Sequence, residues 1–318
     1  MAQIMLSPSH FYGLDVGGTK IELAVYDSTL QLRYSKRIAT PTRDYATFLQ
    51  AVELLVREAD ARLHTIGAVG LGIPGVVDAA SGQHQSANVP AINGANLRTD
   101  LQQRLERQVA IGNDCHCFAL SEANGGAAHG YPSMFGAILG TGVGGGYCVD
   151  GVLASGRNGQ AGEWGHWSVS AALLARHGLP LLGADGNRAG CLEHYLAGSG
   201  LAALYQIVGG APRDARTIVE RAGDHDVLAV RALAIHIDLL AQGLASLVLA
   251  LDPHVIVLGG GLSNMAHLYH QLPLAMRRHL LDDVVPPPIL APVFGDAGGA
   301  RGAALLARAR QAANHLTY

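Results

Sequence analysis

FYGLDVGGTKIELAVYD, residues Phe11 to Asp27, consists of an apolar stretch, a Gly-Gly turn and a second apolar stretch. In the second stretch Ile21, Leu23 and Val25 alternate with their neighbours, which is the period of a strand with one buried face. Two such stretches joined by glycines predict a β-hairpin.

The same arrangement returns later in the chain. FGAILGTGVGGGYCVDG, from Phe135 to Gly151, again has an apolar stretch, a glycine-rich turn, a second stretch and an Asp. Two similar units roughly 120 residues apart predict two related domains, each of which offers a glycine turn to one ligand. This repeat implies a cleft between the domains.

Strands and helices alternate around these hairpins. Residues 44–63 carry apolar side chains at helical spacing, and the stretches TIGAVGLGIPG (65–75) and QVAIGNDC (108–115) are typical of buried strands. The pattern indicates an α/β sheet, in which ligand-facing residues gather at strand ends.

The second half adds a long helix and a third glycine turn. Residues 227–251 are apolar almost all round, which predicts a buried helix, and DPHVIVLGGGLS (252–263) then predicts a strand that ends in glycines. An Ala- and Arg-rich helix is expected from about Ala300 to Asn314.

Composition limits the class of protein. The 318 residues are 49% hydrophobic and 15% charged, which suits about two globular domains. The net charge is −3 and no Lys/Arg cluster is present, so neither nucleic acid nor an anionic membrane is an expected partner. The start lacks the features of a signal peptide, and no apolar run is expected to span a membrane, which predicts a cytoplasmic protein. The four cysteines are too scattered for a disulfide framework and are expected to be free thiols.

Glycine turns after strands are suited to phosphate, because backbone N–H groups can approach the anion where no side chain intervenes. Each glycine turn alone is weak evidence for a phosphate site, since glycine also occurs in plain hairpins. GLDVGGTK lacks the Lys-Ser/Thr order of a P-loop, and GTGVGG (140–145) leads into a strand pattern where a dinucleotide site needs a helix. A dinucleotide oxidoreductase is therefore disfavoured.

Seven motifs together carry a resemblance. LDVGGTK, GIPG, GNDCHCFALSEA, ILGTGVGGG, GEWGH, GCLEHY and LGGGLS, in this order from about residue 11 to 308, resemble the ROK family of sugar kinases and repressors. SANVPAINGANL and DCHCFALSEA are most similar to its bacterial N-acetyl-D-glucosamine kinases. The resemblance implies an actin-like, hexokinase-like ATPase fold with an interdomain active-site cleft. It also implies a small domain of residues 1–121, completed by the C-terminal helix at about 302–318, and a large domain of residues 122–301.

The resemblance gives roles to acidic residues and glycines. Asp114 corresponds to the catalytic base, and the alternative from the residues alone is an Asp that caps a helix beginning at Cys115. Asp15 resembles the residue near Mg²⁺ and the transferring phosphate, with ATP as the donor. The residues assigned to the nucleotide are Gly13, Asp15, Gly17, Gly18, Thr19, Lys20, Gly140, Thr141, Gly142, Gly144, Gly145, Gly146, Gly259, Gly260 and Gly261. For Lys20 a solvated hairpin lysine is the alternative.

A second set is assigned to the sugar by the same resemblance. Carboxylates and amides suit a polyhydroxylated ligand, because each hydroxyl both donates and accepts hydrogen bonds. Glu163 and His166 would share one face in a helical turn. Trp164 and Trp167 could stack on a sugar ring, although core packing is favoured. The assigned residues are Asn88, Asn113, Asp114, Glu163, His166 and Glu193.

One motif departs from the family pattern. Many members hold a structural zinc through C-x-C-G-x-x-G-C and the His of G-E-x-G-H, but Ala184 and Gly186 stand at the first two cysteine positions here. Only Cys191 and His166 remain of the ligand set, so no structural zinc is expected. Cys115, His116 and Cys117 are adjacent on a predicted helix, so their side chains diverge and do not predict a metal site.

The resulting expectation is an ATP- and Mg²⁺-dependent kinase for the 6-hydroxyl of N-acetyl-D-glucosamine. Kinases for glucose, fructose or N-acetylmannosamine, and a non-catalytic sugar sensor, are the alternatives. A repressor of the family would need a helix-turn-helix ahead of the first strand, where only about ten residues stand. The family resemblance also suggests a homodimer.

Overall fold

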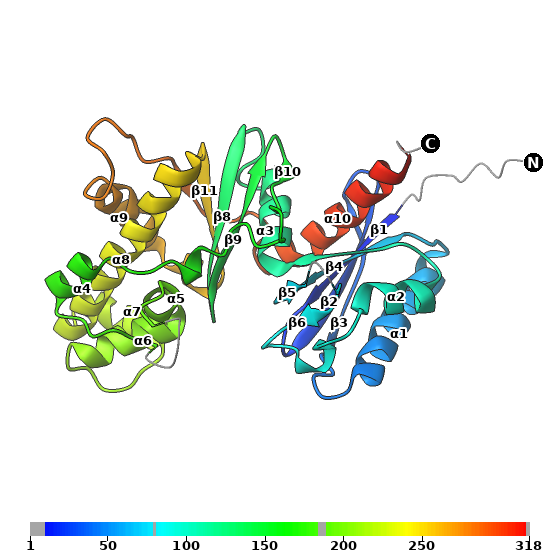
Figure 1. Cartoon of the computed structure of the whole chain (residues 1–318), viewed down its shortest axis with the longest axis horizontal. Coiled ribbons are helices and arrows are strands. Elements are labelled where there is room, and N and C mark those ends of the chain that lie inside the picture. The colour runs from blue at the N-terminus through cyan, green and yellow to red at the C-terminus, as the bar shows by residue number, and fades with distance from the viewer. Residues whose placement is uncertain (1–9, 79–80, 184–188, 316–318) are drawn as a thin grey trace, which may run out of the picture. The chain divides into compact units, whose positions relative to one another are not determined.

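The computed structural model describes residues 10–78, 81–183 and 189–315. Contacts within the chain divide it into two units (Figure 1). The first unit runs to Ser121 and also takes in Ser155–Ala161 and the C-terminal segment from Asp296. The second contains Glu122–Ala154 and Gly162–Gly295. The predicted large domain had included residues 155–161 and 296–301, which contact the first unit.

The first unit is built on a five-stranded sheet in the order β3-β2-β1-β4-β7. The hairpin of β1 (His10–Val16) and β2 (Lys20–Asp27) is antiparallel, as predicted, and Val16 pairs with Ile21 across it. The third antiparallel strand is β3 (Leu32–Ala39), whereas β4 (Ala68–Ile73) and β7 (Val109–Asn113) run parallel to β1. The carboxyl ends of three parallel strands therefore meet at one edge.

Helices complete this unit (Figure 1). The predicted amphipathic helix is α1 (Tyr45–Leu63), and its N-cap Asp44 accepts a hydrogen bond from the Thr47 N–H at 2.7 Å. The remaining elements are β5 (Val76–Val77), β6 (His84–Gln85), the 3₁₀ turn η1 (Pro90–Ile92), α2 (Leu97–Leu105), α3 (Asp114–Ala123) and α10 (Gly298–His315).

The Ala-rich helix α10 packs directly on the backbone of the sheet. A Cβ atom on Gly13 would lie 1.8 Å from the Ala300 carbonyl oxygen, and one on Gly70 would lie 1.9 Å from that of Ala303. Small residues on both sides allow this approach, since any added methyl group would separate the layers. Gly13, which the sequence assigned to the nucleotide, thus has a packing reason to be glycine.

The second unit repeats the pattern of the first. Its sheet has the order β10-β9-β8-β11-β12, and β8 (Ser133–Leu139) pairs antiparallel with β9 (Val143–Val149). The parallel neighbour β11 (Val255–Gly259) and the short strands β10 (Val152–Leu153) and β12 (Ile289–Leu290) complete it. A hairpin followed by a parallel strand in both sheets confirms the predicted repeat and the actin-like α/β fold.

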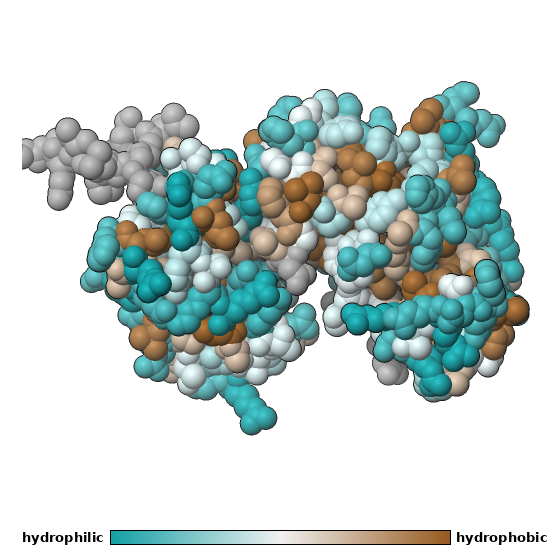
Figure 2. All heavy atoms as spheres, turned by 180° about the vertical axis from the view of Figure 1, so that it is seen from behind, coloured by the Kyte–Doolittle hydropathy of each residue, from teal (hydrophilic) through white to brown (hydrophobic). Residues whose placement is uncertain are grey.

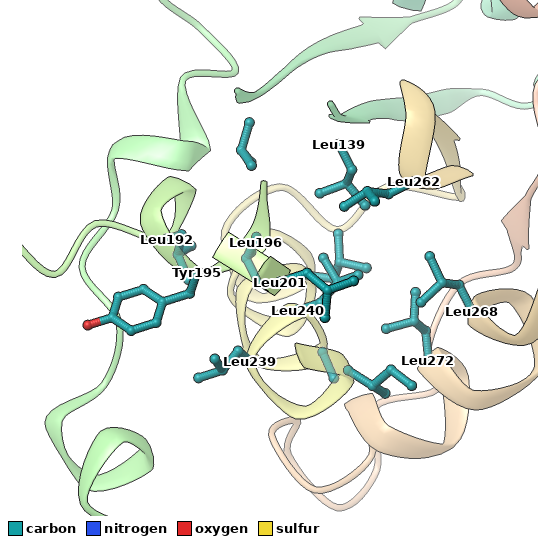
Figure 3. Packing of buried hydrophobic residues seen from close by; sticks show 14 of the residues in the cluster. Leu139, Leu192, Tyr195, Leu196, Leu201, Leu239, Leu240, Leu262, Leu268 and Leu272 are labelled. Carbon is teal, nitrogen blue, oxygen red and sulfur yellow. The ribbon is translucent and has the colours of Figure 1, made fainter. Parts of the chain in front are cut away.

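Most helices belong to this second unit. They are η2 (Trp164–His166), α4 (Ala171–His177), α5 (Glu193–Leu196), α6 (Gly198–Ile207), α7 (Ala215–Gly223), α8 (Val227–Leu251), η3 (Gly261–Asn264) and α9 (Ala266–Met276). The short turn η4 (Gly295–Ala297) lies where the chain returns to the first unit, ahead of α10. Leucines of α8 and α9 pack with Leu139 and Leu262 in one core, and the hydroxyl of Tyr195 points away from it (Figure 3).

Helix α8 corrects one expectation from the sequence. It is 25 residues long and apolar enough to cross a membrane by length and composition, although no such run was expected. In its most apolar window, 78% of the residues are buried within the structure. Core packing accounts for its composition, because a helix that is hydrophobic all round needs apolar neighbours on every side.

The exposed surface is mixed in character. On the face drawn in Figure 2, hydrophilic residues predominate and hydrophobic residues are scattered between them. Scattered apolar side chains are normal on a protein surface.

Candidate active site

The first glycine turn joins β1 to β2 in the first unit. The Gly17 N–H donates to the Lys20 carbonyl at 2.9 Å, and the Thr40 hydroxyl donates to the Gly17 carbonyl at 2.7 Å. A Cβ atom on Gly18 would lie 2.8 Å from the backbone oxygen of Asn88, so only glycine fits there. The fold therefore brings Asn88, an expected sugar ligand, beside the expected phosphate turn.

Asp15 and Asp114 are placed at the same edge of this sheet. Asp15 pairs with Gly72, and Gly72 pairs with Gly112, at the carboxyl ends of β1, β4 and β7. Burial, followed by the negative charges of Asp15 and Asp114, raises the pKa of the Cys117 thiol well above its ordinary value. A Cβ atom on Gly72, the partner of Asp15, would lie 3.8 Å from the Cα of Asp114, so the two acidic residues flank the same strand residue.

Asp114 begins α3, directly after β7. The Cys115 N–H lies 3.0 Å from Asp114 Oδ1 and 2.8 Å from Asn113 Oδ1, while Asn113 Nδ2 donates to the Gly75 carbonyl at 3.2 Å. The helix-capping alternative therefore describes part of the local geometry. Desolvation nevertheless raises the pKa of Asp114 and outweighs the hydrogen bond from Cys115. A carboxylate with raised proton affinity is suited to accept a proton.

The second glycine turn lies in the second unit and is shorter than expected. Gly140 to Gly142 form the turn, whereas Gly144, Gly145 and Gly146 are part of strand β9. A Cβ atom on Gly145 would lie 2.5 Å from the Phe135 ring, so this glycine serves packing within the hairpin.

Glu193 contacts this second turn. Its Oε2 accepts a hydrogen bond from the Val143 N–H at 2.9 Å, and a Cβ atom on Gly142 would lie 2.7 Å from the same oxygen. A residue assigned to the sugar thus touches the backbone assigned to the nucleotide. Local sequence patterns do not predict this contact, because 50 residues separate the two partners.

The GEWGH segment forms the turn η2. His166 Nε2 lies 3.5 Å from Glu163 Oε2, so the two side chains share one face, as expected for a helical turn. Trp164 is only 1% exposed, donates from Nε1 to the Gly144 carbonyl at 2.8 Å and meets Phe135 edge-on. Its role is core packing, whereas Trp167 is 38% exposed.

Cys191 lies beside this turn. Its Sγ is 3.4 Å from the His166 carbonyl oxygen, and a short antiparallel bridge joins Cys191 to Ser168. Tyr195 donates to the Pro180 carbonyl and accepts from the Leu182 N–H, which fixes the chain that leads into the degenerate motif. Ala184 and Gly186 lie outside the described residues, so the expected absence of zinc stays a prediction.

In the segment Cys115–Cys117 on α3, neighbouring side chains point in different directions. Cys117 is buried against Gly72, where a Cβ atom would lie 2.8 Å from its sulfur. His116 Nε2 is instead within 2.7 Å of the Ala161 carbonyl oxygen. Neighbouring side chains on α3 therefore reach different partners, as adjacent helical positions require.

A cavity of about 1070 Å³ joins the second and third glycine turns within the second unit. Gly260 has a φ of 77° and lies against the Leu139 carbonyl, where a Cβ atom would stand at 2.4 Å, so this turn requires glycine. The first residues of α6 and α7 also line the cavity, and the N-terminus of α6, which has no side-chain cap, favours anions. The lining includes Gly140, Thr141, Gly198, Ser199, Asp214, Ala215, Arg216, Gly261, Leu262 and Asn264.

The sequence patterns did not predict that residues of α6 and α7 line this cavity. Asp214 caps α7 and accepts from the Thr217 N–H at 2.8 Å, so an Asp-x-x-Thr signal for a helix start was available. That signal predicts a helix end but not its place on a ligand cavity. The location depends on how the helices pack.

Comparison with known proteins places these features in a family. Residues 11–310 match the sequence profile of the ROK family. The chain is 47% identical over 296 residues to the N-acetylgalactosamine kinase AgaK of Shewanella sp. (strain ANA-3), with 93% of this chain and 96% of that protein covered. It is 45% identical over 298 residues to the N-acetyl-D-glucosamine kinase of Salmonella arizonae, with 93% of this chain and 98% of that protein covered.

Solved structures agree. The ROK hexokinase of Thermus thermophilus has a TM-score of 0.85 and 32% identity, with 96% of this chain and 99% of that one covered. A ROK glucokinase of Streptomyces griseus, solved with glucose and AMPPNP, has a TM-score of 0.75 and 28% identity, with 94% and 99% covered. The chain belongs to the ROK family.

Proposed function

We propose that this protein transfers the γ-phosphoryl group of ATP to the 6-hydroxyl of N-acetyl-D-glucosamine. The observation that carries the proposal is the desolvated carboxylate of Asp114 at the edge where three parallel strands end. Relatives with 42–45% identity over 93% of the chain are N-acetyl-D-glucosamine kinases, which supports the choice of reaction and sugar.

Asp114 serves as the general base. As the sugar O6 attacks the γ-phosphorus, its proton passes to a carboxylate oxygen of Asp114, and the bond from the γ-phosphorus to the bridging oxygen of ADP breaks. The raised pKa brings the proton affinity of Asp114 closer to that needed near neutral pH. One O–P bond thus forms as another breaks, and the proton of O6 ends on Asp114.

Asp15 is the residue proposed to hold Mg²⁺ with ATP. Carboxylate oxygens are the ligands this ion prefers, and Asp15 stands at a strand end beside the first glycine turn. Bound Mg²⁺ would neutralise charge on the transferring phosphate. Gly17 closes that turn through its hydrogen bond to the Lys20 carbonyl, while Gly18 and Thr19 supply backbone N–H groups for the phosphate and Lys20 supplies the cation.

The nucleotide is assigned to the cavity of the second unit. Gly140, Thr141 and Gly261 line it, and the N-terminus of α6, which has no side-chain cap, adds N–H groups that suit phosphates. ATP use is supported by the kinases among the relatives, one of them solved with AMPPNP.

The sugar is assigned to six polar side chains. They are Asn88, Asn113, Asp114, Glu163, His166 and Glu193. Their carboxylates, amides and imidazole match the donors and acceptors that sugar hydroxyls need.

N-acetyl-D-galactosamine is a second candidate substrate. A relative at 47% identity is an N-acetylgalactosamine kinase, and that sugar differs from N-acetylglucosamine only in the configuration at C4. A site built to hydrogen-bond one configuration of a hydroxyl discriminates strongly against the other, because a misplaced hydroxyl leaves buried polar groups unpaired.

A coupled ADP-release assay tests the proposal. The panel contains N-acetylglucosamine, N-acetylgalactosamine, N-acetylmannosamine, glucose and fructose, each with ATP and Mg²⁺. The highest kcat/KM is expected for N-acetylglucosamine. A higher value for N-acetylgalactosamine would move the assignment to that sugar, and sugar binding without ADP release would establish a non-catalytic sensor.

The proposal also includes a cytoplasmic location and a homodimer. The cysteines are free thiols in the structure, which suits a reducing cytoplasm. The homodimer is proposed from the family resemblance, and light scattering on the purified protein checks it.

A further inference from the structure

A second cavity lies in the second unit and shares no lining residue with the nucleotide cavity. Its volume is about 580 Å³, within the range of small-molecule sites. Three arginines, a histidine and an aspartate line it, and none of them is among the residues assigned to the nucleotide or the sugar. They are Arg176, His177, Arg231, Asp238 and Arg278.

Three helices bring these side chains together. Arg176 and His177 are the last residues of α4, and Arg278 follows the end of α9. Arg231 and Asp238 lie seven residues, or about two turns, apart on α8, which puts them on one face. The cavity is thus formed by tertiary packing of elements that are far apart in the sequence.

The charge of Asp238 is already compensated. Its carboxylate accepts hydrogen bonds from His177 Nε2 at 2.8 Å, His279 Nε2 at 2.9 Å and Arg278 Nη2 at 3.0 Å. The Asp238 side chain is only 8% exposed, so these partners, and not water, satisfy it. Asp238 therefore serves to hold the ends of α4 and α9 on α8.

Positive charge remains after this compensation. Three guanidinium groups face one carboxylate, which leaves two positive charges before either histidine is counted. The side chains of Arg176 and Arg278 are 61% and 62% exposed. Within the part of the chain that the structure describes, Arg231 has no ion pair or hydrogen bond. The cavity therefore carries a local excess of positive charge, whereas the whole chain has a net charge of −3.

The wall of the cavity also has an apolar side. Ile235 of α8 and Leu274 of α9 line it, and Leu274 is largely exposed. A ligand with an anionic end and an organic body would use both kinds of surface. Guanidinium groups match the geometry of phosphate oxygens, and two surplus positive charges match a dianion.

We propose that this cavity binds an organic phosphate, a small molecule that carries a phosphate monoester. Arg176, Arg231 and Arg278 hold the phosphate, and Leu274 and Ile235 contact the organic part. The proposal does not depend on the kinase activity, although the product of that reaction belongs to the same chemical class.

Isothermal titration of the full chain tests the site. Saturating AMPPNP and N-acetylglucosamine keep the proposed active site filled, and N-acetylglucosamine 6-phosphate or inorganic phosphate is then added. The wild type is expected to bind the sugar phosphate more tightly than inorganic phosphate. Arg231→Ala, which removes no contact with Asp238, should weaken binding by about tenfold.

Arg62→Ala, an exposed arginine on α1 of the first unit, is the matched control and should bind like the wild type. Thermal melting shows that each variant is folded. The proposal is wrong if the wild type binds neither phosphate at millimolar concentration, or if Arg231→Ala binds as the wild type does. Equal affinity for inorganic phosphate would remove the organic part of the proposal. An altered oligomeric state of Arg231→Ala with unchanged binding would assign this face to an interface between copies of the chain.

Discussion

Gly299, in the first turn of α10, lies directly against the carboxylate of Asp15. A Cβ atom on Gly299 would stand 2.7 Å from both Cγ and Oδ2 of Asp15, closer than such atoms approach in proteins. Asp15 comes from the first strand and Gly299 from the last helix, so the two ends of the first unit meet at this carboxylate. The glycine thus sets the position available to a side chain that we assign to Mg²⁺ and phosphate.

Gly299→Ala is expected to displace Asp15 and lower kcat by roughly 10²-fold, because catalysis is sensitive to misplacement of about 1 Å. Steady-state kinetics checks this, with the sugar KM expected near its wild-type value. Gly223→Ala, at the end of α7 with no atom near the added methyl group, should leave kcat unchanged. A wild-type kcat in Gly299→Ala would show that Asp15 can shift away from the added methyl group without loss of activity.

Asp114→Asn should lower kcat by about 10²–10⁴ while sugar binding persists, because the amide cannot accept the proton. Burial raises the pKa of Asp114, so folding favours its protonated form, and the charged form reduces stability as pH rises through that pKa. The neutral amide should therefore raise Tm at pH 7. Kinetics and thermal melting together check both effects, and near-normal turnover would remove Asp114 from the role of base.

The wild-type activity should also rise with pH through the raised pKa of Asp114. The base must be ionised to accept a proton, so kcat/KM falls on the acid side of that pKa. A pH–rate profile with N-acetylglucosamine checks this limb. The small residual activity of Asp114→Asn should not show it.

Glu193 is expected to affect both substrates. Glu193→Ala removes the acceptor of the Val143 N–H beside the second glycine turn, so the KM for ATP as well as the KM for sugar should rise, by about tenfold. Glu193→Gln keeps an oxygen acceptor and should leave the ATP KM near the wild-type value. Equal ATP KM values in Glu193→Ala and the wild type would confine Glu193 to the sugar.

Asp238→Asn should destabilise the second unit by about 3 kcal/mol, because the buried carboxylate accepts hydrogen bonds from two histidines and Arg278. Burial acts to raise the pKa of Asp238, but the hydrogen bonds from His177 and His279 and the charge of Arg278 bring it below its ordinary value of 3.8. The stabilisation is therefore present above pH 3.8 and is lost as pH falls through the lowered pKa. Urea unfolding at several pH values checks this, and the gap to the wild type should narrow in acid. Asp283→Asn, in an exposed segment, is the control.

Local pattern was sufficient for much of this protein. Alternation around the Gly-Gly turn predicts the β1–β2 hairpin, and its repetition predicts the second sheet, because strand period and turn chemistry act over a few neighbouring residues. The motif order placed the chain in a sugar-kinase family. It also indicated Asp114 at a strand end, where parallel sheets gather ligand-facing residues.

Other features required the folded chain. The composition of α8 suits a membrane helix as well as a core helix, and its packing in the second unit distinguishes the two. The contacts of Gly299 with Asp15, of Glu193 with Val143 and of Asp238 with the ends of α4 and α9 join residues that lie far apart along the chain. Side-chain period cannot show such contacts, because they arise only when whole helices and sheets pack together and bring distant backbone and charge within a few ångströms.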